Sequence, residues 1–296
     1  MRVPDRDTFY IVDVFSSRPY QGNPLAVVWG QRSPELMQAI TREMNYSETT
    51  FLEAGAPGEP GEPYPVRIFT PGRELPFAGH PTLGTAFVLR HFLGVPDDSL
   101  VLQEAVGPIP VHVEQRDGRD CYWMTQNAPT FGTTYDVKGM AELLSLPADA
   151  IDGQYPIQAV STGLPALIVP LVSVEAASQS RLDLEKYRAL LRAGAPSSVL
   201  VFAKGGVQAG HDIHVRVFVG DLGIPEDPAT GSANGCLAAY LLKYGVTGGT
   251  VDAVVEQGVE MGRPSTLYLR ARHRGGRVEV GGEVVPVAEG RLLPRP

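Results

Sequence analysis

Two segments half a chain apart follow the same order of sequence features, and this internal repeat constrains the fold more than any other feature. The strand-like VRIF at residues 66–69 recurs as VRVF at residues 215–218. Each is followed by an irregular stretch, a glycine-polar pair at residues 79–80 or 231–232, and a run of small apolar residues. The offset is 149 residues at the strands and 152 at the glycines, about half of the 296-residue chain. Such a repeat indicates two like-folded domains related by a pseudo-twofold axis.

The composition is that of a globular protein of about two domains. Apolar residues make up 43% of the chain and charged residues 20%, enough to bury substantial cores. The net charge of −8 and the lack of a basic run argue against a nucleic-acid partner. The sequence shows no signal-peptide pattern and no apolar stretch of membrane-spanning length, so we expect a cytoplasmic protein with no membrane partner. The predicted domains are residues 1–122 and 123–296, and the extreme C-terminus could return to complete the first.

Short strands and helices are mixed without a regular strand-helix-strand rhythm, which favours an α+β class with antiparallel or mixed sheets. A helix is expected to start near Ser33-Pro34 and to bury Leu36, Ile40 and Met44, which are spaced four residues apart. Strands are predicted at residues 8–15, 25–29, 47–52, 66–70, 166–172 and 199–202.

The glycines ahead of the two small-residue runs favour an anion-binding function. A helix N-terminus carries unpaired backbone N–H groups and about half a unit of positive charge. Gly79 and Gly231 would let the backbone come close to a ligand. Two such helix ends would bind a carboxylate or a developing oxyanion. The alternative for either copy alone is a well-capped core helix, and the presence of two matched copies favours function.

Five blocks of the chain resemble the recurring blocks of PhzF-like proteins, relatives of the phenazine-biosynthesis isomerase that share the fold of diaminopimelate epimerase. The resemblance runs from near residue 9 to about residue 270. It implies two similar α+β domains, each a curved mixed sheet around a central helix, with the active site between them. It also implies a cofactor-independent isomerase that works by acid–base catalysis, and a homodimer. The blocks are IVDVFSSRPYQGNPLAVV, MNYSETTFL, RIFTPGRELPFAGHPTLGTA, EDPATGSANGCLAAYL and EQGVEMGRPS.

The matching motifs assign the family's functional residues to positions in this sequence. Glu48 of the NYSE block would take a proton from one carbon of a small carboxylate substrate and return it to another. The resemblance implies further catalytic residues and a set of substrate-binding residues, and it implies no metal. The further catalytic residues are His80, Asp227 and Ser232, and the substrate-binding residues are Ser47, Gly79, Gly231 and Asn23.

The cysteines do not fit the chemistry of the epimerase branch, in which two cysteines in the paired loops carry out the acid–base steps. Ala78 and Ala229 lie in that region here. Cys236 is four residues past Ser232, and Cys121 is in neither block. We therefore do not expect racemisation by two thiols, and the spacing of the cysteines fits a reducing compartment.

Each assigned residue also has a purely structural interpretation. From the residues alone, Glu48 would be a solvent-facing strand glutamate, whereas burial in the strand-like SETTFLE would make it a stronger base. His80 could cap a helix, and Asp227 before Pro228 could be a turn residue. Ser232 is expected to be a helix N-cap as well as a ligand contact. The block match favours catalysis for Glu48.

Two further clusters look chemical. His211 and His214 of HDIH are expected on opposite faces of one strand, and with no third ligand they do not predict a metal site. Glu256, Glu260 and Arg263 are expected in a loop near the cleft, where Arg263 could bind a substrate carboxylate.

Two other classes of function stay open at this point. Ser232, His80 and Asp227 are the residue types of a hydrolase triad. A nucleophile elbow reads G-x-S-x-G, however, and here glycine directly precedes serine. The triad would also leave Glu48 without a role. The other class is a non-catalytic small-molecule-binding homologue, against which the intact set of four polar residues argues. The sequence selects neither a substrate nor a pathway.

Overall fold

The computed structural model describes residues 4–5, 7–52, 62–96, 98–220, 225–273 and 276–293. The chain divides into two compact units, and each is described by itself. The first unit is Met1–Thr125 together with Gly281–Pro296, and the second is Gln126–Val280. The division thus falls after residue 125, and the C-terminal segment groups with the first unit.

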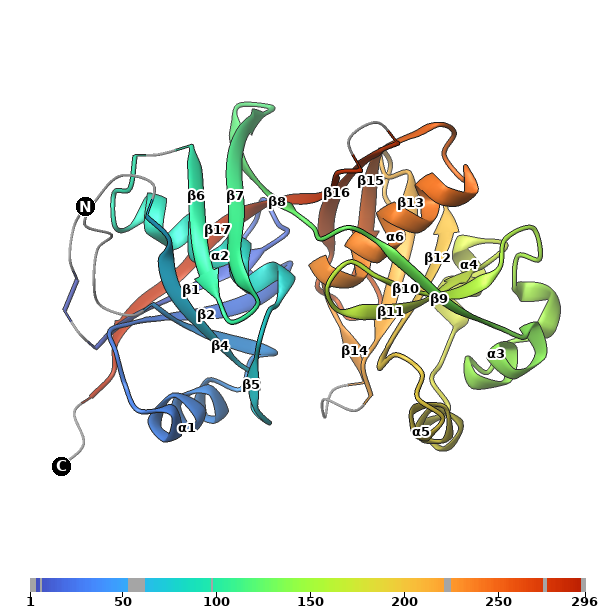
Figure 1. The fold of residues 1–296 in the computed structure, drawn as a ribbon, viewed down its shortest axis with the longest axis horizontal. Helices are drawn as coiled ribbons and strands as arrows, with labels where there is room; N and C mark the ends of the chain where they lie inside the picture. The colour runs from blue at the N-terminus through green and yellow to red at the C-terminus, as the bar shows by residue number, and fades with distance from the viewer. Residues whose placement is uncertain are drawn as a thin grey trace. The chain divides into compact units, whose positions relative to one another are not determined.

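The first unit is a mixed sheet with one inner and one outer helix (Figure 1). Strand β17 (Val278–Arg291) pairs antiparallel with β1 and also pairs with β8. The other strands are β1 (Thr8–Val14), β2 (Asn23–Trp29), β3 (Glu48–Leu52), β4 (Tyr64–Phe69), β5 (Glu74–Leu75), β6 (Ser99–Glu104), β7 (Gly107–Arg116) and β8 (Arg119–Thr125), and the helices are α1 (Pro34–Met44) and α2 (Gly79–His91).

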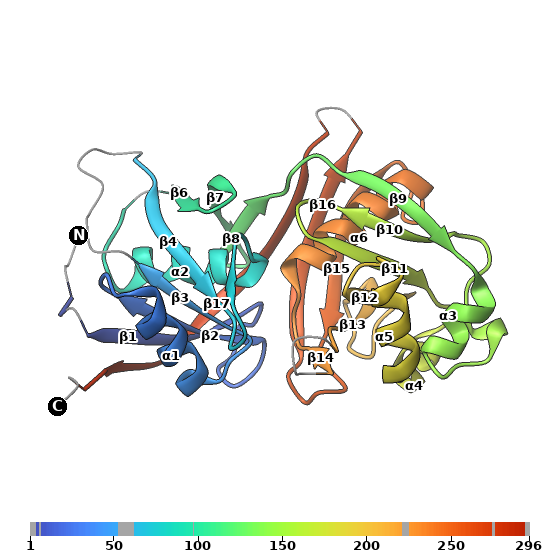
Figure 2. The same ribbon diagram turned by 60° about the horizontal axis from the view of Figure 1, so that its bottom comes forward.

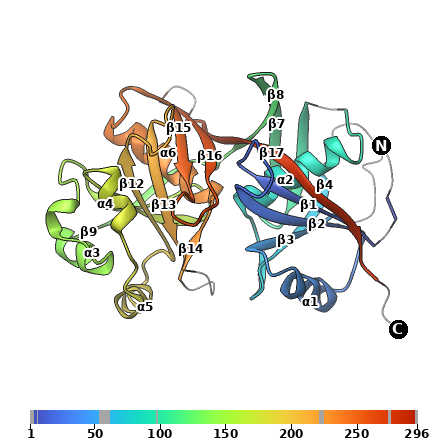
Figure 3. The same ribbon diagram turned by 180° about the vertical axis from the view of Figure 1, so that it is seen from behind.

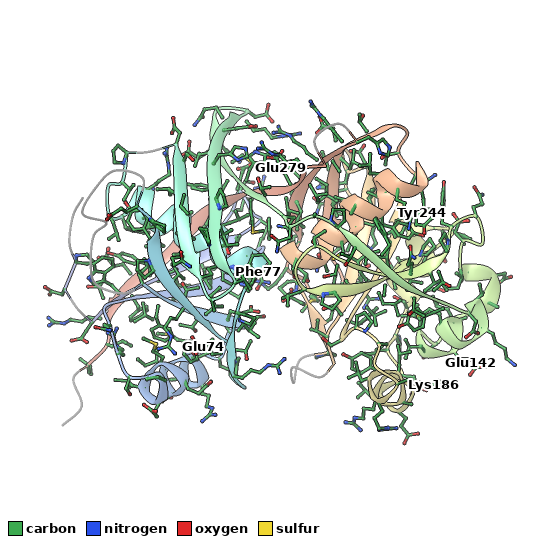
Figure 4. All side chains as sticks on the ribbon, in the orientation of Figure 1. Glu74, Phe77, Glu142, Lys186, Tyr244 and Glu279 are labelled. Atoms are coloured by element: carbon green, nitrogen blue, oxygen red, sulfur yellow. The ribbon has the colours of Figure 1, made fainter. Side chains whose placement is uncertain are left out.

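The second unit has the same kind of sheet with more helices on its outer side. Helix α4 packs against β12 and β13, and α3 packs against α5, where Lys186 and Glu142 form an ion pair at 3.3 Å (Figure 4). The strands are β9 (Thr130–Tyr135), β10 (Ile157–Ser161), β11 (Pro165–Pro170), β12 (Ser198–Lys204), β13 (Ile213–Phe218), β14 (Glu226–Asp227), β15 (Thr250–Gln257) and β16 (Ser265–Arg272). The helices are α3 (Val137–Leu143), a short 3₁₀ turn (Ala148–Ala150), α4 (Val174–Gln179), α5 (Leu184–Arg192) and α6 (Gly231–Tyr244).

The strands of the two units pair in the same order and with the same directions. In the first unit β1–β2 is antiparallel, β2–β3 parallel, β3–β4 antiparallel, β4–β5 antiparallel, β4–β6 parallel and β6–β7 antiparallel. In the second unit β10 to β16 repeat these pairings one for one. Helix α2 follows β5, and α6 follows β14. The repeat predicted from the sequence is therefore a repeat of topology.

Each sheet wraps around one buried helix. Strands β1, β2, β3, β6, β7 and β8 all contact α2, and β10, β11, β12, β15 and β16 contact α6; Figure 3 shows both helices from behind. A helix enclosed on all sides has no polar face, which accounts for the small-residue runs. At Gly84 a Cβ atom would lie 2.6 Å from Leu25, and at Gly235 it would lie 2.7 Å from Gln126. A side chain at either position would therefore displace the neighbouring side chain of Leu25 or of Gln126.

Helix α1 packs on the outer side of β3 and β4 (Figure 2). Its predicted start is confirmed, because Ser33 is the N-cap and accepts from the backbone N–H of Leu36. The predicted buried face is wrong by one position: Met37 and Thr41 are fully buried, whereas Leu36 and Ile40 are only half-buried. Within the described part of the chain, no helix is both long enough and apolar enough to cross a membrane.

Candidate active site

The first unit presents a buried helix N-terminus without a side-chain cap. Helix α2 begins at Gly79, and its N-cap residue is Ala78, which has extended backbone and offers no polar side chain. The structural interpretation of His80 as the cap is therefore wrong, since His80 is the second residue of the helix. Gly79 and His80 are both buried. The local partial positive charge of the helix end is thus kept away from bulk water.

Three polar side chains meet at this helix end, and the sheet topology explains why. Asn23 is the first residue of β2 and Glu48 is the first residue of β3. These strands are parallel neighbours, and Leu25 lies opposite Glu48, so both residues lie at the same edge of the sheet. Asn23 Nδ2 is 3.2 Å from His80 Nδ1, and Glu48 Oε2 is 3.6 Å from His80 Nε2. Ser47, half-buried, directly precedes β3.

His80 is held as a neutral ring. Its side chain is 5% exposed and that of Glu48 is 12% exposed. Burial lowers the pKa of His80 to about 3, and the hydrogen bond to the Pro24 backbone opposes this only in part. At neutral pH the ring therefore has one N–H and one lone pair. Nε2 makes no hydrogen bond to any residue that the structure describes, so the ring nitrogen facing Glu48 is available to donate to a carboxylate.

The second unit builds a different set of contacts at the matching helix end. Helix α6 begins at Gly231 with Thr230 as its N-cap. Thr230 Oγ1 donates to Asp227 Oδ2 at 2.5 Å, and Asp227 is 7% exposed in β14. Ser232 is the second helix residue and is half-buried. The prediction that Ser232 is the N-cap is therefore wrong, because the helix starts one residue before it.

Gln257 and Asn234 support this end of α6, and the sequence reasoning did not find either. Gln257 Nε2 donates to the Asp227 carbonyl at 2.8 Å, and its Oε1 accepts from Asn234 Nδ2 at 2.8 Å. Both side chains are fully buried. The threonine three residues after Asp227 was a signal for the Asp227–Thr230 contact, but no sequence spacing connects position 257 to position 234.

The HDIH segment is part of a buried charge network and not of a simple strand. His211 precedes β13, so the prediction that both histidines lie in one strand and face opposite sides is wrong. His214 Nδ1 is 2.7 Å from Glu256 Oε1, and His211 Nδ1 is 3.7 Å from Glu256 Oε2. His214 Nε2 is 3.0 Å from Glu260 Oε1. Glu256 lies in β15, which corrects its expected place in a loop.

This network favours the charged form of His214. Burial acts against the cation, but hydrogen bonds to Glu260 and Glu256 raise the pKa of His214 above its usual value. Burial also acts against the charged form of Glu260, but the bonds to His214 and Ser178 outweigh it and lower the pKa of Glu260 to about 2. Both ring nitrogens of His214 are thus occupied by carboxylates of its own unit.

Both cysteines are free and buried. Cys236 Sγ donates to the Leu164 carbonyl at 3.3 Å, and burial raises the pKa of its thiol. A thiol that resists ionisation is a poor base, which is in line with the expectation that this chain does not racemise by two cysteines.

The fold belongs with known isomerase and epimerase structures. A predicted epimerase of Pseudomonas aeruginosa is 35% identical, with a TM-score of 0.82 over 98% of this chain and 100% of that one. A PhzF family protein of Bacillus anthracis is 26% identical, with a TM-score of 0.87 over 97% of this chain and 99% of that one. The class is therefore that of the isomerases with an epimerase-type fold.

The particular family follows from the sequence match. Residues 12–290 match the family described as phenazine biosynthesis-like protein, PhzC-PhzF. The trans-2,3-dihydro-3-hydroxyanthranilate isomerase of Pseudomonas aeruginosa is 39% identical over 291 residues, covering 96% of this chain and 98% of that protein. The chain belongs to the phenazine biosynthesis-like (PhzF) family, as the sequence blocks predicted.

Proposed function

We propose that this isomerase moves a proton between two carbons of a small unsaturated carboxylate, with Glu48 as both the base and the acid. The observation that carries the proposal is the 3.6 Å approach of Glu48 Oε2 to Nε2 of the buried, neutral His80. A carboxylate that is 12% exposed is partly removed from water, which strengthens it as a base toward carbon.

The neutral state of His80 matters for this chemistry. A cation 3.6 Å from Glu48 would stabilise the carboxylate and weaken it as a base. Since the amide Nδ2 of Asn23 can only donate to Nδ1, the proton of the neutral ring is on Nε2, where it faces the Glu48 carboxylate without adding a positive charge. Asn23, at 3.2 Å from Nδ1, orients the ring.

The proposed step keeps all atoms and electrons within the substrate and Glu48. A substrate C–H bond breaks as an O–H bond forms on Glu48, and the electron pair shifts along the conjugated system. The same O–H bond then breaks as a new C–H bond forms at the other end. Charge that develops on the substrate carboxylate or its conjugated carbon would be stabilised by backbone N–H groups at a helix N-terminus.

We propose Gly79, Ser47 and Asn23 as substrate contacts of the first unit, and Gly231, Asp227 and Ser232 as those of the second. The support is the same in each unit: a buried or half-buried helix end with no side-chain cap. The first substrate to test is trans-2,3-dihydro-3-hydroxyanthranilate, because it is the compound in the name of the relative that is 39% identical.

The test is turnover of this compound in D₂O, followed by NMR and mass spectrometry. We expect wild type to isomerise it and Glu48→Gln to lose about 10²–10⁴-fold in kcat, which is the contribution typical of general acid–base catalysis. The matched control is Ser198→Ala, since Ser198 lies opposite Ala166 on parallel strands as Glu48 lies opposite Leu25. This control should retain activity.

Two outcomes would overturn parts of the proposal separately. Retained turnover in Glu48→Gln would remove Glu48 as the acid–base residue. No turnover by wild type would remove this substrate, and the same exchange measurement would then be applied to other small unsaturated or α-amino acids.

A further inference from the structure

Glu104, the last residue of β6, reaches the N-terminus of α2 from the sheet. It is 3% exposed, and its Oε1 is 2.6 Å from Thr82 Oγ1. The backbone N–H of Ala78 also bonds to its carboxyl group. Glu104 therefore contacts both the N-cap residue of α2 and the first turn of the helix that carries Gly79 and His80.

The geometry around Thr82 leaves room for a proton on Glu104. Thr82 Oγ1 is 2.7 Å from the Ala78 carbonyl oxygen and 2.6 Å from Glu104 Oε1. A hydroxyl has one proton to donate, and a carbonyl oxygen can only accept. Thr82 donates its proton either to an ionised Glu104 or to the Ala78 carbonyl, and it can keep the bond to the carbonyl only when a proton on Glu104 makes the other contact.

Gln257 occupies the corresponding position in the second unit. In the parallel pair β4–β6, Tyr64 lies opposite Leu102 and Pro65 opposite Gln103, which brings Glu104 level with the first residue of VRIF. In the parallel pair β13–β15, Gln257 lies opposite Val215, the first residue of VRVF. The two side chains thus leave their sheets at equivalent places.

The contacts of the two side chains are also equivalent. Gln257 Oε1 accepts from the backbone N–H of Thr230, the N-cap of α6, at 3.2 Å. It also accepts from Asn234 Nδ2 at 2.8 Å, and Asn234 stands four residues after its N-cap, as Thr82 stands four residues after Ala78. Asn234 Nδ2 donates to the Thr230 carbonyl at 3.0 Å, just as Thr82 donates to that of Ala78. The neutral amide of Gln257 therefore bonds to the N-cap residue and the first turn of α6, as the carboxyl group of Glu104 bonds to those of α2.

The surroundings of Glu104 favour its neutral form. Burial raises the pKa of Glu104 to about 7, with the bonds from Thr82 and Ala78 acting in the opposite direction. A cavity of about 250 Å³ beside it is also lined by Arg67 of β4 and Glu74 of β5, which pair with each other. On α2 the nearby titratable group is the neutral His80, and β7 places Gly107 opposite Glu104. Among the described residues, no charged side chain bonds to Glu104.

We propose that Glu104 is the positioning residue that fixes the N-terminus of α2, and with it Gly79 and His80, and that its ionisation draws the Thr82 hydroxyl away from the Ala78 carbonyl and so shifts this end of the active site. The expected change in kcat rests on the proposed function, whereas the positioning of the α2 N-terminus by Glu104 rests on the geometry alone. Glu104 is not a catalytic residue, because it acts through the helix end. Its role in α2 is the one that Gln257 has in α6.

The experiment compares wild type, Glu104→Gln, Glu104→Ala and the control Glu74→Gln, which removes a charge from the same cavity. In wild type we expect kcat for trans-2,3-dihydro-3-hydroxyanthranilate to fall roughly tenfold between pH 6 and pH 8.5, with little change in KM, because a small misplacement of reacting groups lowers the rate. Glu104→Gln should keep the rate of pH 6 throughout. Glu104→Ala should be slow at every pH, and Glu74→Gln should behave as wild type.

A second readout separates this proposal from the choice of substrate. Carboxyl ¹³C NMR of the wild type should show one glutamate titrating near pH 7 that is absent in Glu104→Gln. A pH limb that persists in Glu104→Gln would overturn the kinetic part. A Glu104 signal that titrates in the ordinary range near pH 4.5 would overturn the proposal whether or not the substrate is turned over.

Discussion

The N-termini of α2 and α6 have the same backbone surroundings and different chemistry. The strand registers that relate Glu48 to Ser198 also relate Asn23 to Leu164, and the helix offset relates His80 to Ser232. The first unit thus has a carboxylate, an amide and an imidazole where the second has two hydroxyls and an apolar side chain. The repeated fold supplies a helix end in each unit, and a few side chains at fixed positions decide which polar groups meet there.

Each unit also has an arginine–glutamate ion pair at the same position of its sheet, and the two ion pairs differ in burial. Arg67 bonds to Glu74 through Nε and Nη2, both at 2.7 Å, and Arg216 bonds to Glu226 in the same way at 2.9 and 2.8 Å. Each guanidinium also lies over the phenylalanine two residues on. The first pair is 28% and 40% exposed, whereas the second is 9% and 10% exposed. Figure 4 shows Glu74 on β5.

Breaking these two ion pairs should give the largest contrast between the units. Arg216→Met should cost about 3–5 kcal/mol, because it leaves Glu226 buried without its cation and removes donors to the carbonyls of Ala177, Ser178 and Ser180. Arg67→Met should cost less than about 1 kcal/mol, since its partner is exposed. Hydrogen exchange measured separately in β13 and β4 is the readout, because two units need not unfold as one. Equal losses in both variants would contradict the comparison.

Substitutions at the second residue of each helix should affect catalysis unequally. His80→Asn should lower kcat by roughly a hundredfold, because Glu48 loses the neutral ring beside it. Ser232→Ala should lower kcat/KM by roughly tenfold, the loss of one hydrogen bond to substrate. Steady-state kinetics on the substrate that wild type turns over will measure both. A larger loss for Ser232→Ala than for His80→Asn would shift the catalytic role to the second unit and revive the serine-nucleophile alternative.

The two buried histidines should make the stability of the two units depend on pH in opposite directions. These changes in stability should be smaller than the loss expected for Arg216→Met. The pKa of His80 is lower in the folded state, so the unfolded chain binds the extra proton below about pH 6.5. The first unit should therefore lose about 2 kcal/mol between pH 6.5 and pH 5, at about 1.4 kcal/mol per pH unit. The pKa of His214 is higher in the folded state. Its contribution is present below pH 6.5 and is lost as the pH rises through the folded value.

Amide exchange of α2 and of β13 between pH 5 and pH 8 measures this difference. The acid sensitivity of α2 should disappear in His80→Asn, which has no group that titrates in this range. An α2 segment of wild type that is as stable at pH 5 as at pH 7 would show that His80 is not held neutral by burial.

Local patterns predicted those features that depend on neighbouring residues. The N-cap at Ser33, the strand around Ser47–Leu52 and the two small-residue helices follow from hydrogen-bonding side chains and side-chain volume within a few positions. Apolar spacing places the buried face of α1 at Leu36 and Ile40, one position before the buried Met37 and Thr41. The side of the helix that meets the sheet depends on the packing of β3 and β4 and not on apolar spacing alone. The prediction that both histidines of HDIH lie in one strand is wrong because β13 begins only at Ile213. His211 therefore lies before the strand, where its side chain contacts Glu256.

The sequence by itself determined that this chain repeats a strand, a loop and a glycine-led helix. Its motifs identified the family and predicted Glu48 as the acid–base residue. Only the tertiary structure decided that Asn23, Glu48 and His80 meet, that His80 is neutral, and that Glu104 and Gln257 hold the two helix ends. The physical reason is the range of each effect. Helix and turn preferences act over a few residues, whereas desolvation and side-chain hydrogen bonds depend on strands that parallel pairing brings together from distant parts of the chain.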